Sequence, residues 1–170
     1  MNKHIFDLST RLGAVLRENS STVTTAESCT GGGVASAITA ISGSSEWFHS
    51  GYVTYANHAK IRTLGVSEKT LENNGAVSEA VVIEMAHGAA KAANADFSIA
   101  ISGVAGPTGG TVEKPVGTVW FAWLGPQGIR SEQRNFSGDR NAIREQSVEI
   151  SIQELLHHVM ECTTVHPYSN

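Results

Sequence analysis

The chain has 170 residues, of which 41% are hydrophobic and 16% charged, with a formal net charge of −4. The length suits one domain with a real core, and intrinsic disorder is disfavoured because it needs few apolar residues and much charge. No cluster of Lys or Arg supports nucleic-acid binding, and no apolar run approaches the roughly 18 residues of a membrane span. Cys29 and Cys162 form no disulfide framework, and no signal peptide is apparent, so we expect a cytoplasmic protein.

Hydrophobic periodicity and turn residues predict alternating helices and strands, followed by a hairpin. Helices are expected over 3–18, 32–41 and 59–64, with Asn57 as the cap of the third, then after Ser67, after Ser78, and through Val148 to Val159 near the C-terminus. Strands are expected over 21–26, 51–55, 96–102, 116–124 and 129–136. This pattern favours an α/β fold with a mixed sheet covered by helices, whose strand order the sequence does not reveal.

Residues 25–33 read Thr-Ala-Glu-Ser-Cys-Thr-Gly-Gly-Gly, so a predicted strand enters a glycine-rich turn and a helix follows. Such a turn directs backbone N–H groups to one spot, and the helix N-terminus adds partial positive charge. Ser28 could attack a carbonyl there while the amides stabilise the oxyanion. An N-cap serine with packing glycines is an equally good interpretation. Cys29 is a conceivable nucleophile in the same turn, although a small buried cysteine is the commoner case.

A serine nucleophile needs a base, and the seven histidines, His166 among them, lie on predicted helices or near the chain ends. Lys60 falls in the first turn of a predicted short helix, where positive potential and burial would lower its pKa towards a neutral, basic amine. Tyr55, at the end of the preceding strand, could relay a proton or orient that amine. A surface lysine and a packing tyrosine are the alternative interpretation.

Residues 102–110 leave a buried strand and are too rich in glycine for a plain turn. Because ligands of open α/β sheets lie beyond the carboxyl ends of strands, this loop could share one site with Ser28. Its candidate binding residues are Ser102, Gly103, Gly106, Thr108 and Gly109. A flexible surface loop is the alternative.

Arg140 follows Asp139, which is the expected cap of the last helix. A cation in the first turn opposes the helix dipole, so it suits an anionic ligand such as a phosphate. The alternative is an ion pair of Arg140 with Asp139 or Glu145.

Several motifs in this order resemble the C-terminal domain family of the competence/damage-inducible protein CinA, which includes stand-alone nicotinamide-nucleotide amidases. The similarity covers about 20–160. The family often has Thr where this chain has Ser102 and Ser where it has Ala56. The matching segments are residues 26–32, 43–45, 53–57 with Lys60, 75–79, 103–107 with 109–110, 114–119 and 138–140.

The resemblance implies a single amidase domain over 1–170, built as three α/β/α layers around a mixed, mostly parallel sheet. It implies hydrolysis of nicotinamide mononucleotide (NMN) to nicotinic acid mononucleotide and ammonia, feeding NAD salvage. It also implies a small-molecule substrate, no nucleic-acid or membrane partner, no metal or other cofactor, and a homo-oligomer, most simply a dimer.

The resemblance further implies a Ser–Lys mechanism, with Ser28 as nucleophile and Lys60 as base, assisted by Tyr55. Backbone amides of Thr30, Gly31 and Gly32 would bind the oxyanion. The loop over 102–110 would hold the ring or ribose, and Arg140 the phosphate. The alternatives are a non-catalytic nucleotide-binding module, or an amidase acting on another small pyridine carboxamide.

Overall fold

The computed structural model describes residues 2–164 and contains helices and strands close to those expected. His166 lies outside the described residues. No helix in the described part of the chain is long and apolar enough to cross a membrane. In chain order the elements are α1 (Lys3–Glu18), β1 (Val23–Glu27), α2 (Gly33–Thr39), the 3-10 turn η1 (Ser44–Glu46), β2 (Tyr52–Val53), α3 (Asn57–Leu64), α4 (Glu68–Asn74), α5 (Glu79–Ala93), β3 (Phe97–Gly103), β4 (Thr118–Gly125), β5 (Gly128–Asn135) and α6 (Arg140–Thr164).

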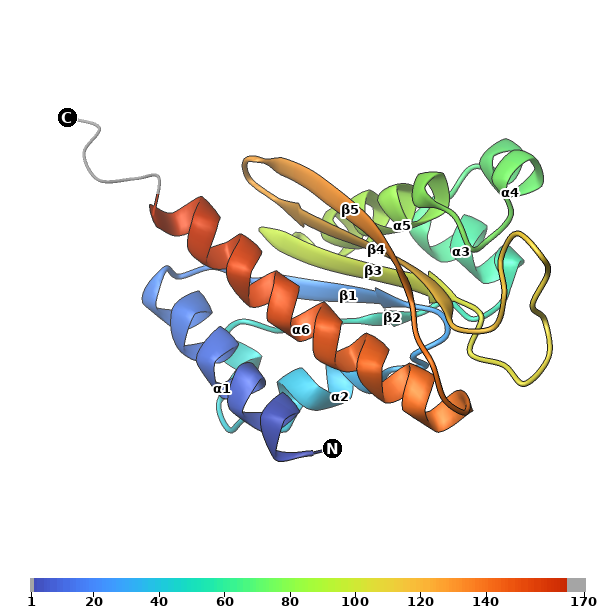
Figure 1. Ribbon diagram of the computed structural model, residues 1–170. Helices are drawn as coiled ribbons and strands as arrows, with labels where there is room; N and C mark the ends of the chain where they lie inside the picture. Colours follow the sequence, from blue (N-terminus) through green and yellow to red (C-terminus); the bar gives the residue numbers. More distant parts are fainter. Residues whose placement is uncertain (1, 165–170) are drawn as a thin grey trace.

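The strands form one sheet in the order β2-β1-β3-β4-β5. β1 pairs in parallel with both β2 and β3, whereas β4 runs antiparallel to both of its neighbours. All strands of this sheet except β4 therefore run in one direction, which confirms a mixed, mostly parallel sheet. As a consequence, the carboxyl ends of β1, β2 and β3 meet at one edge of the sheet (Figure 1).

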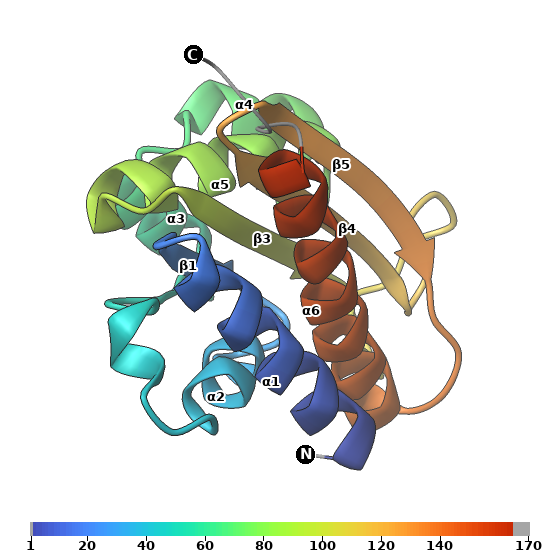
Figure 2. The same ribbon diagram turned by 90° about the vertical axis from the view of Figure 1, so that its left-hand side faces the viewer.

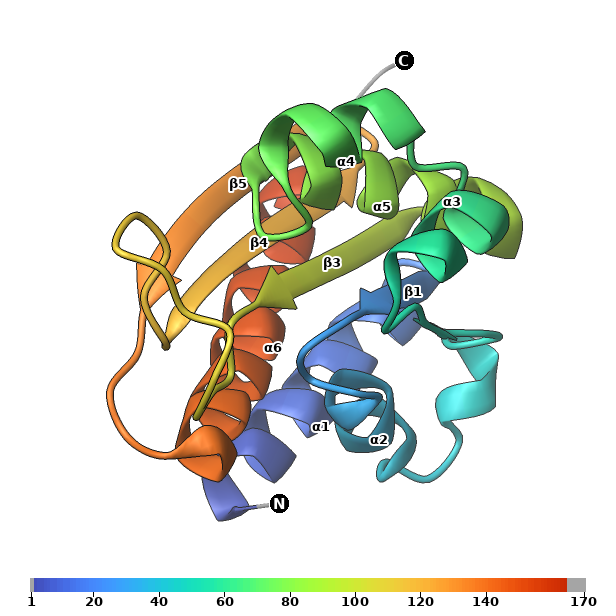
Figure 3. The same cartoon turned by 90° about the vertical axis from the view of Figure 1, so that its right-hand side faces the viewer.

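Helices cover both faces of the sheet, so the three-layer prediction is confirmed. α6 and α1 lie side by side on one face, with α2 beside them (Figures 1 and 2). α5 lies on the other face, with α3 and α4 packed against it (Figure 3). The alternation along β3 explains the two layers, because Ile99 and Ile101 pack in the cluster beneath α6, whereas Ala100 faces α5.

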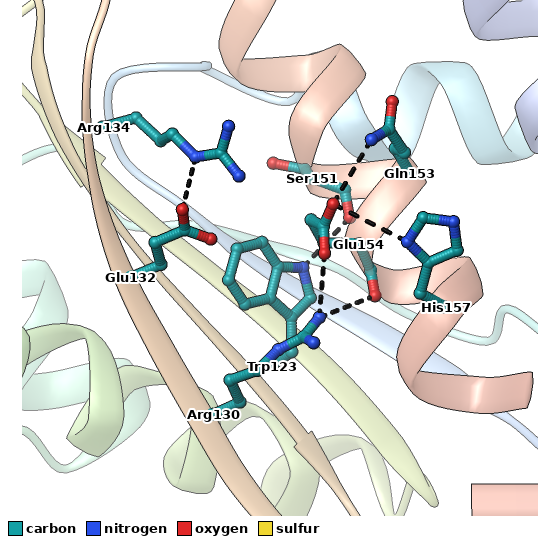
Figure 4. A network of polar contacts seen from close by, with 8 residues as sticks. All are labelled: Trp123, Arg130, Glu132, Arg134, Ser151, Gln153, Glu154 and His157. Atoms are coloured by element: carbon teal, nitrogen blue, oxygen red, sulfur yellow. Dashed lines mark hydrogen bonds and ion pairs between the residues drawn. The ribbon is translucent and has the colours of Figure 1, made fainter. Parts of the chain in front are cut away.

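A network of polar contacts ties the outer strand β5 to α6 (Figure 4). Arg130 bonds the Glu154 carboxylate at 3.1 Å, and its guanidinium carbon lies 5.3 Å from the Trp123 ring centroid. The indole N–H of Trp123 donates to the carbonyl of Ser151 at 3.1 Å. These contacts help fix α6 across the sheet, and thereby the position of its first turn, which carries Arg140.

The region around β2 differs from the expectation. The strand expected over 51–55 contains only Tyr52 and Val53, and α3 begins at Asn57 with Ala56 rather than Asn57 as its N-cap. The Thr54 amide still donates to the carbonyl of Glu27 at 2.9 Å, but the Thr54 carbonyl accepts a bond from Lys60 Nζ instead of a strand amide. The chain therefore leaves the sheet early and turns directly into α3.

Candidate active site

Ser28 directly follows β1, at the edge where the parallel strands end. Its amide donates to the carbonyl of Ile101 at 3.0 Å, which extends the pairing of β1 with β3 by one residue. Its carbonyl accepts the Gly31 amide at 3.0 Å and closes a tight turn. Gly31 and Gly32 adopt φ values of +59° and +96°, which side chains strongly disfavour. This glycine turn fixes Ser28 between the strand and α2.

The buried carboxylate of Glu27 holds the far end of the same turn. It accepts the amides of Gly32 at 3.1 Å, Val34 at 3.0 Å and Ala35 at 2.8 Å, and thereby satisfies free N–H groups at the start of α2. The sequence analysis missed this role. The available signal was general: a carboxylate near a helix N-terminus is stabilised by the free N–H groups and the helix dipole.

The hydrogen bonds of Glu27 and Ser28 occupy two of the three amides that were expected to bind the oxyanion. The amides of Gly31 and Gly32 are already donated to Ser28 and Glu27, so these two glycines are not free to bind an oxyanion. Within residues 2–164, the amides of Cys29 and Thr30 donate to no carbonyl or carboxylate, and the Cys29 amide interacts only with its own thiol. Of the three residues expected to supply this site, only Thr30 keeps an amide that could bind an oxyanion, and the Cys29 amide is a second candidate.

Lys60 meets Ser28 in the interior of the protein. Its Nζ lies 3.1 Å from Ser28 Oγ and donates to the Thr54 carbonyl at 2.8 Å, and the side chain is only 1% exposed. No carboxylate forms an ion pair with it among the described residues. Burial lowers the pKa of the Lys60 amine from its ordinary value of 10.5, and the nearby Cys29 opposes this more weakly. A neutral amine at this position can accept the Ser28 proton.

Arg140 lines the same cavity as Ser28 and Lys60. Its guanidinium donates to the Tyr55 hydroxyl at 2.6 Å and to the Gly106 carbonyl at 2.7 Å. The expected alternative pairing with a carboxylate is absent from the described residues, because Asp139 caps the Ala142 amide and Glu145 accepts from Asn2. The positive charge of Arg140 is therefore not neutralised by the protein.

Tyr55 lies farther from the reacting pair than the sequence analysis expected. Its side chain is 57% exposed, and its hydroxyl contacts Arg140. Within the described residues it makes no hydrogen bond to Ser28 or Lys60. The geometry suits a residue that orients Arg140 more than one that relays protons.

Most of the predicted site residues line one cavity of about 300 Å³. This volume is at the lower end of the range for ligand pockets. The amides of Ala105, Gly106, Thr108 and Gly109 have no acceptor in the described part of the chain, so this loop offers several free donors. Thr30 lies outside this cavity and lines a separate one near α6. The lining residues include Ser28, Tyr55, Asn57, Lys60, Ser102, Gly103, Gly106, Thr108, Gly109 and Arg140.

Cys29 also borders this cavity, but its chemistry differs from that of a reactive cysteine. The thiol is buried, and burial raises its pKa to about 12. Because the thiolate is the nucleophilic form, this thiol is a poor nucleophile near neutral pH. The described residues also contain no group of three or more His, Cys, Asp or Glu side chains that could hold a metal ion.

A second arginine, Arg144, is a site residue that the sequence analysis missed. It lies one helical turn after Arg140 and donates to the carbonyls of Cys29 and Thr30, each at 3.1 Å. The signal was a pair of cations four residues apart near a helix N-terminus, where each opposes the helix dipole.

Known proteins match this chain over almost its full length. The sequence model of the CinA C-terminal domain family matches residues 6–159 of this chain. The nicotinamide-nucleotide amidohydrolase PncC of Escherichia coli (strain K12) is 52% identical over 163 residues, covering 95% of this chain and 99% of the relative. The protein of the same name from Pseudomonas putida is 55% identical over 152 residues, covering 89% and 95%.

Solved structures agree with these sequence matches. The crystal structure of a CinA superfamily protein from Klebsiella pneumoniae superposes with a TM-score of 0.90 at 40% identity and covers 95% of this chain and 99% of that one. The resemblance seen in the sequence motifs is therefore confirmed in sequence and in fold. The chain belongs to the CinA C-terminal domain family.

Proposed function

We propose that this chain is a nicotinamide-nucleotide amidase that hydrolyses the carboxamide of NMN to nicotinic acid mononucleotide and ammonia. The observation that carries the proposal is the buried contact of 3.1 Å between Lys60 Nζ and Ser28 Oγ. A lysine without a carboxylate partner, held against a serine in a cavity, is the arrangement that an activated hydroxyl nucleophile requires. The two relatives named PncC support the choice of substrate.

Binding of the nucleotide would use the charges and donors around the cavity. Arg140 would turn from Gly106 and Tyr55 to bind the 5′-phosphate, which is the natural partner for its uncompensated charge. The free amides over 105–109 would contact the ribose and ring. Tyr55 would orient Arg140.

The acylation step would begin with Ser28 Oγ attacking the carboxamide carbon while its proton passes to Lys60 Nζ. The amides of Cys29 and Thr30 would stabilise the negative oxygen of the tetrahedral intermediate, as N–H groups next to a nucleophile do in other hydrolases. The protonated Lys60 would return the proton to the leaving nitrogen, so that ammonia departs and a Ser28 ester remains.

The deacylation step would reverse these roles. Water would give one proton to Lys60 and attack the ester carbon, and the bond to Ser28 Oγ would break. Lys60 would then return the proton to Ser28, releasing nicotinic acid mononucleotide and the free enzyme. No step needs a metal or an organic cofactor.

The wider setting is part of the same proposal. We infer that the single domain acts in the cytoplasm as a homodimer and returns the nicotinate nucleotide to NAD salvage. Light scattering on the purified chain would measure the oligomeric state, and a monomeric mass would contradict the dimer.

The test is ammonia release by the purified protein from NMN, compared with free nicotinamide, NAD and nicotinamide riboside. We expect release from NMN, its loss in Ser28→Ala, and its retention in Cys29→Ala. Turnover of another carboxamide but not NMN would shift the substrate class. Binding of NMN without turnover would favour the non-catalytic nucleotide-binding module.

A further inference from the structure

Arg144 reaches the turn behind the nucleophile from the first turns of α6. Its Nε donates to the Cys29 carbonyl and its Nη2 to the Thr30 carbonyl, each at 3.1 Å. No carboxylate pairs with it among the described residues. Two N–H groups of the guanidinium are therefore bonded to the peptide units Cys29–Thr30 and Thr30–Gly31.

These bonds determine where the neighbouring N–H groups point. In a trans peptide the C=O and N–H groups point in opposite directions. Because Arg144 on α6 holds the Cys29 carbonyl, the Thr30 amide of the same peptide faces away from Arg144. Charge-assisted bonds to a carbonyl also polarise its peptide, which strengthens the N–H as a donor.

The turn needs such a restraint because glycines make it flexible. Gly31 and Gly32 have φ values of +59° and +96°, a region in which the backbone has little steric guidance of its own. Glu27 holds the amides at the α2 end of the turn, and Arg144 holds the carbonyls at the Ser28 end. The buried Glu27 and the partly buried Arg144 thus hold the turn from both ends, and within it the amides of Cys29 and Thr30 donate to no backbone carbonyl or carboxylate among residues 2–164.

We propose that Arg144 is a positioning residue for the amidase reaction, which aims the Thr30 amide at the developing oxyanion, next to the Cys29 amide. The inference rests on the proposed function and deepens it, because it assigns the oxyanion site and the residue that holds it. Arg144 does not touch the substrate in this proposal, so its loss should act on kcat and leave KM for NMN nearly unchanged.

A second cavity makes this proposal testable by chemical rescue. It has a volume of about 330 Å³, and Arg144 lines it whereas Ser28 does not. When Arg144 is shortened to alanine, a free guanidinium ion can enter through this space and occupy the position of the lost group. The lining residues are Ile5, Thr30, Gly33, Ser36, Ala37, Arg144, Glu145 and Val148.

The experiment compares wild type, Arg144→Ala and Arg144→Lys, with Arg11→Ala as the control at an exposed arginine on α1. We expect Arg144→Ala to lower kcat about 10²-fold, the scale for loss of one oxyanion donor. Arg144→Lys should be intermediate, because lysine keeps the charge but not the planar fork. Millimolar guanidinium chloride should raise kcat of Arg144→Ala and no other variant. The midpoint of the dependence of kcat on pH, which reports the pKa of Lys60, should be the same in Arg144→Ala as in wild type.

A second readout separates this inference from the proposed function. A fluorophosphonate probe phosphonylates an activated serine: the bond from Ser28 Oγ to phosphorus forms, the P–F bond breaks, fluoride leaves and the proton passes to Lys60. Its labelling rate should fall in Arg144→Ala and recover with guanidinium, whether or not NMN is the substrate. Wild-type kcat and labelling rates in Arg144→Ala would overturn the inference. A loss in both Arg144 variants that guanidinium does not restore would assign Arg144 to folding alone and would also overturn it.

Discussion

Replacing Lys60 by methionine tests the protonation state on which the mechanism depends, without any substrate. Burial lowers the pKa of Lys60 in the folded protein, whereas the unfolded chain keeps a value near 10.5. Between these two pKa values the unfolded state binds more protons, so the free energy of unfolding of the wild type should rise with pH in that window. Lys60→Met removes this dependence. The stability difference between wild type and variant should therefore change in favour of wild type as pH rises.

The size of this pH dependence follows from a difference of one bound proton between the unfolded and the folded state. In the window the difference should change by up to about 1.4 kcal/mol per pH unit, and below the folded pKa it should be flat. The loss of the Thr54 carbonyl's partner adds a cost of roughly 1–3 kcal/mol that does not vary with pH, so the slope is the test and the offset is not.

The assay is urea denaturation of both proteins at closely spaced pH values from neutral to about pH 10, with linear extrapolation at each pH. Lys69→Met, at an exposed lysine on α4, is the matched control. A difference between wild type and Lys60→Met that stays constant across this range would mean that Lys60 remains an ammonium in the folded protein. That result would refute its role as the base.

Three further predictions concern activity and packing. kcat/KM for NMN should rise with pH and reach its plateau well below pH 10.5, and an activity that still climbs at that pH would contradict the lowered pKa of Lys60. Arg140→Ala should raise KM for NMN about 10- to 100-fold while leaving any turnover of nicotinamide riboside unchanged, and an unchanged KM would remove Arg140 from phosphate binding. Gly88→Ala should destabilise the protein by about 1–3 kcal/mol in urea denaturation and lower kcat, because its Cβ would overlap the Leu64 carbonyl at the end of the helix that carries Lys60. Gly88 lies on α5, so a variant as stable as wild type would show that the close approach of α5 does not hold α3 in place.

Local signals in the sequence predicted most of the elements. Ser67 and Ser78 were expected to begin helices, and each hydroxyl oxygen accepts an amide at the start of its helix, at 3.4 Å. The hairpin of β4 and β5 was visible from its apolar strand and glycine-rich turn. The strand order was not, because pairings such as β1 with β3 join residues more than 70 positions apart, and no local pattern encodes them.

The candidate site was predictable in its residues but not in its contacts. The turn chemistry around Ser28 and the helix position of Lys60 made each a candidate, yet only the fold brings these side chains, 32 residues apart, to 3.1 Å. The sequence could not reveal that Tyr55 partners Arg140 instead of Lys60, since 85 residues separate that pair. It also could not reveal which amides of the glycine turn are already occupied, because the Glu27 carboxylate takes them from within the core.

The central claim, that Ser28 carries the acyl group during hydrolysis of NMN, is tested most directly by trapping the intermediate. Wild type and Cys29→Ala are mixed with NMN, quenched in acid within the first turnover, and digested for peptide mass spectrometry. The account predicts the mass of a nicotinate mononucleotide ester on Ser28 in both proteins, formed together with one equivalent of ammonia. Ammonia release without an adduct on Ser28, or an adduct that disappears in Cys29→Ala, would contradict it.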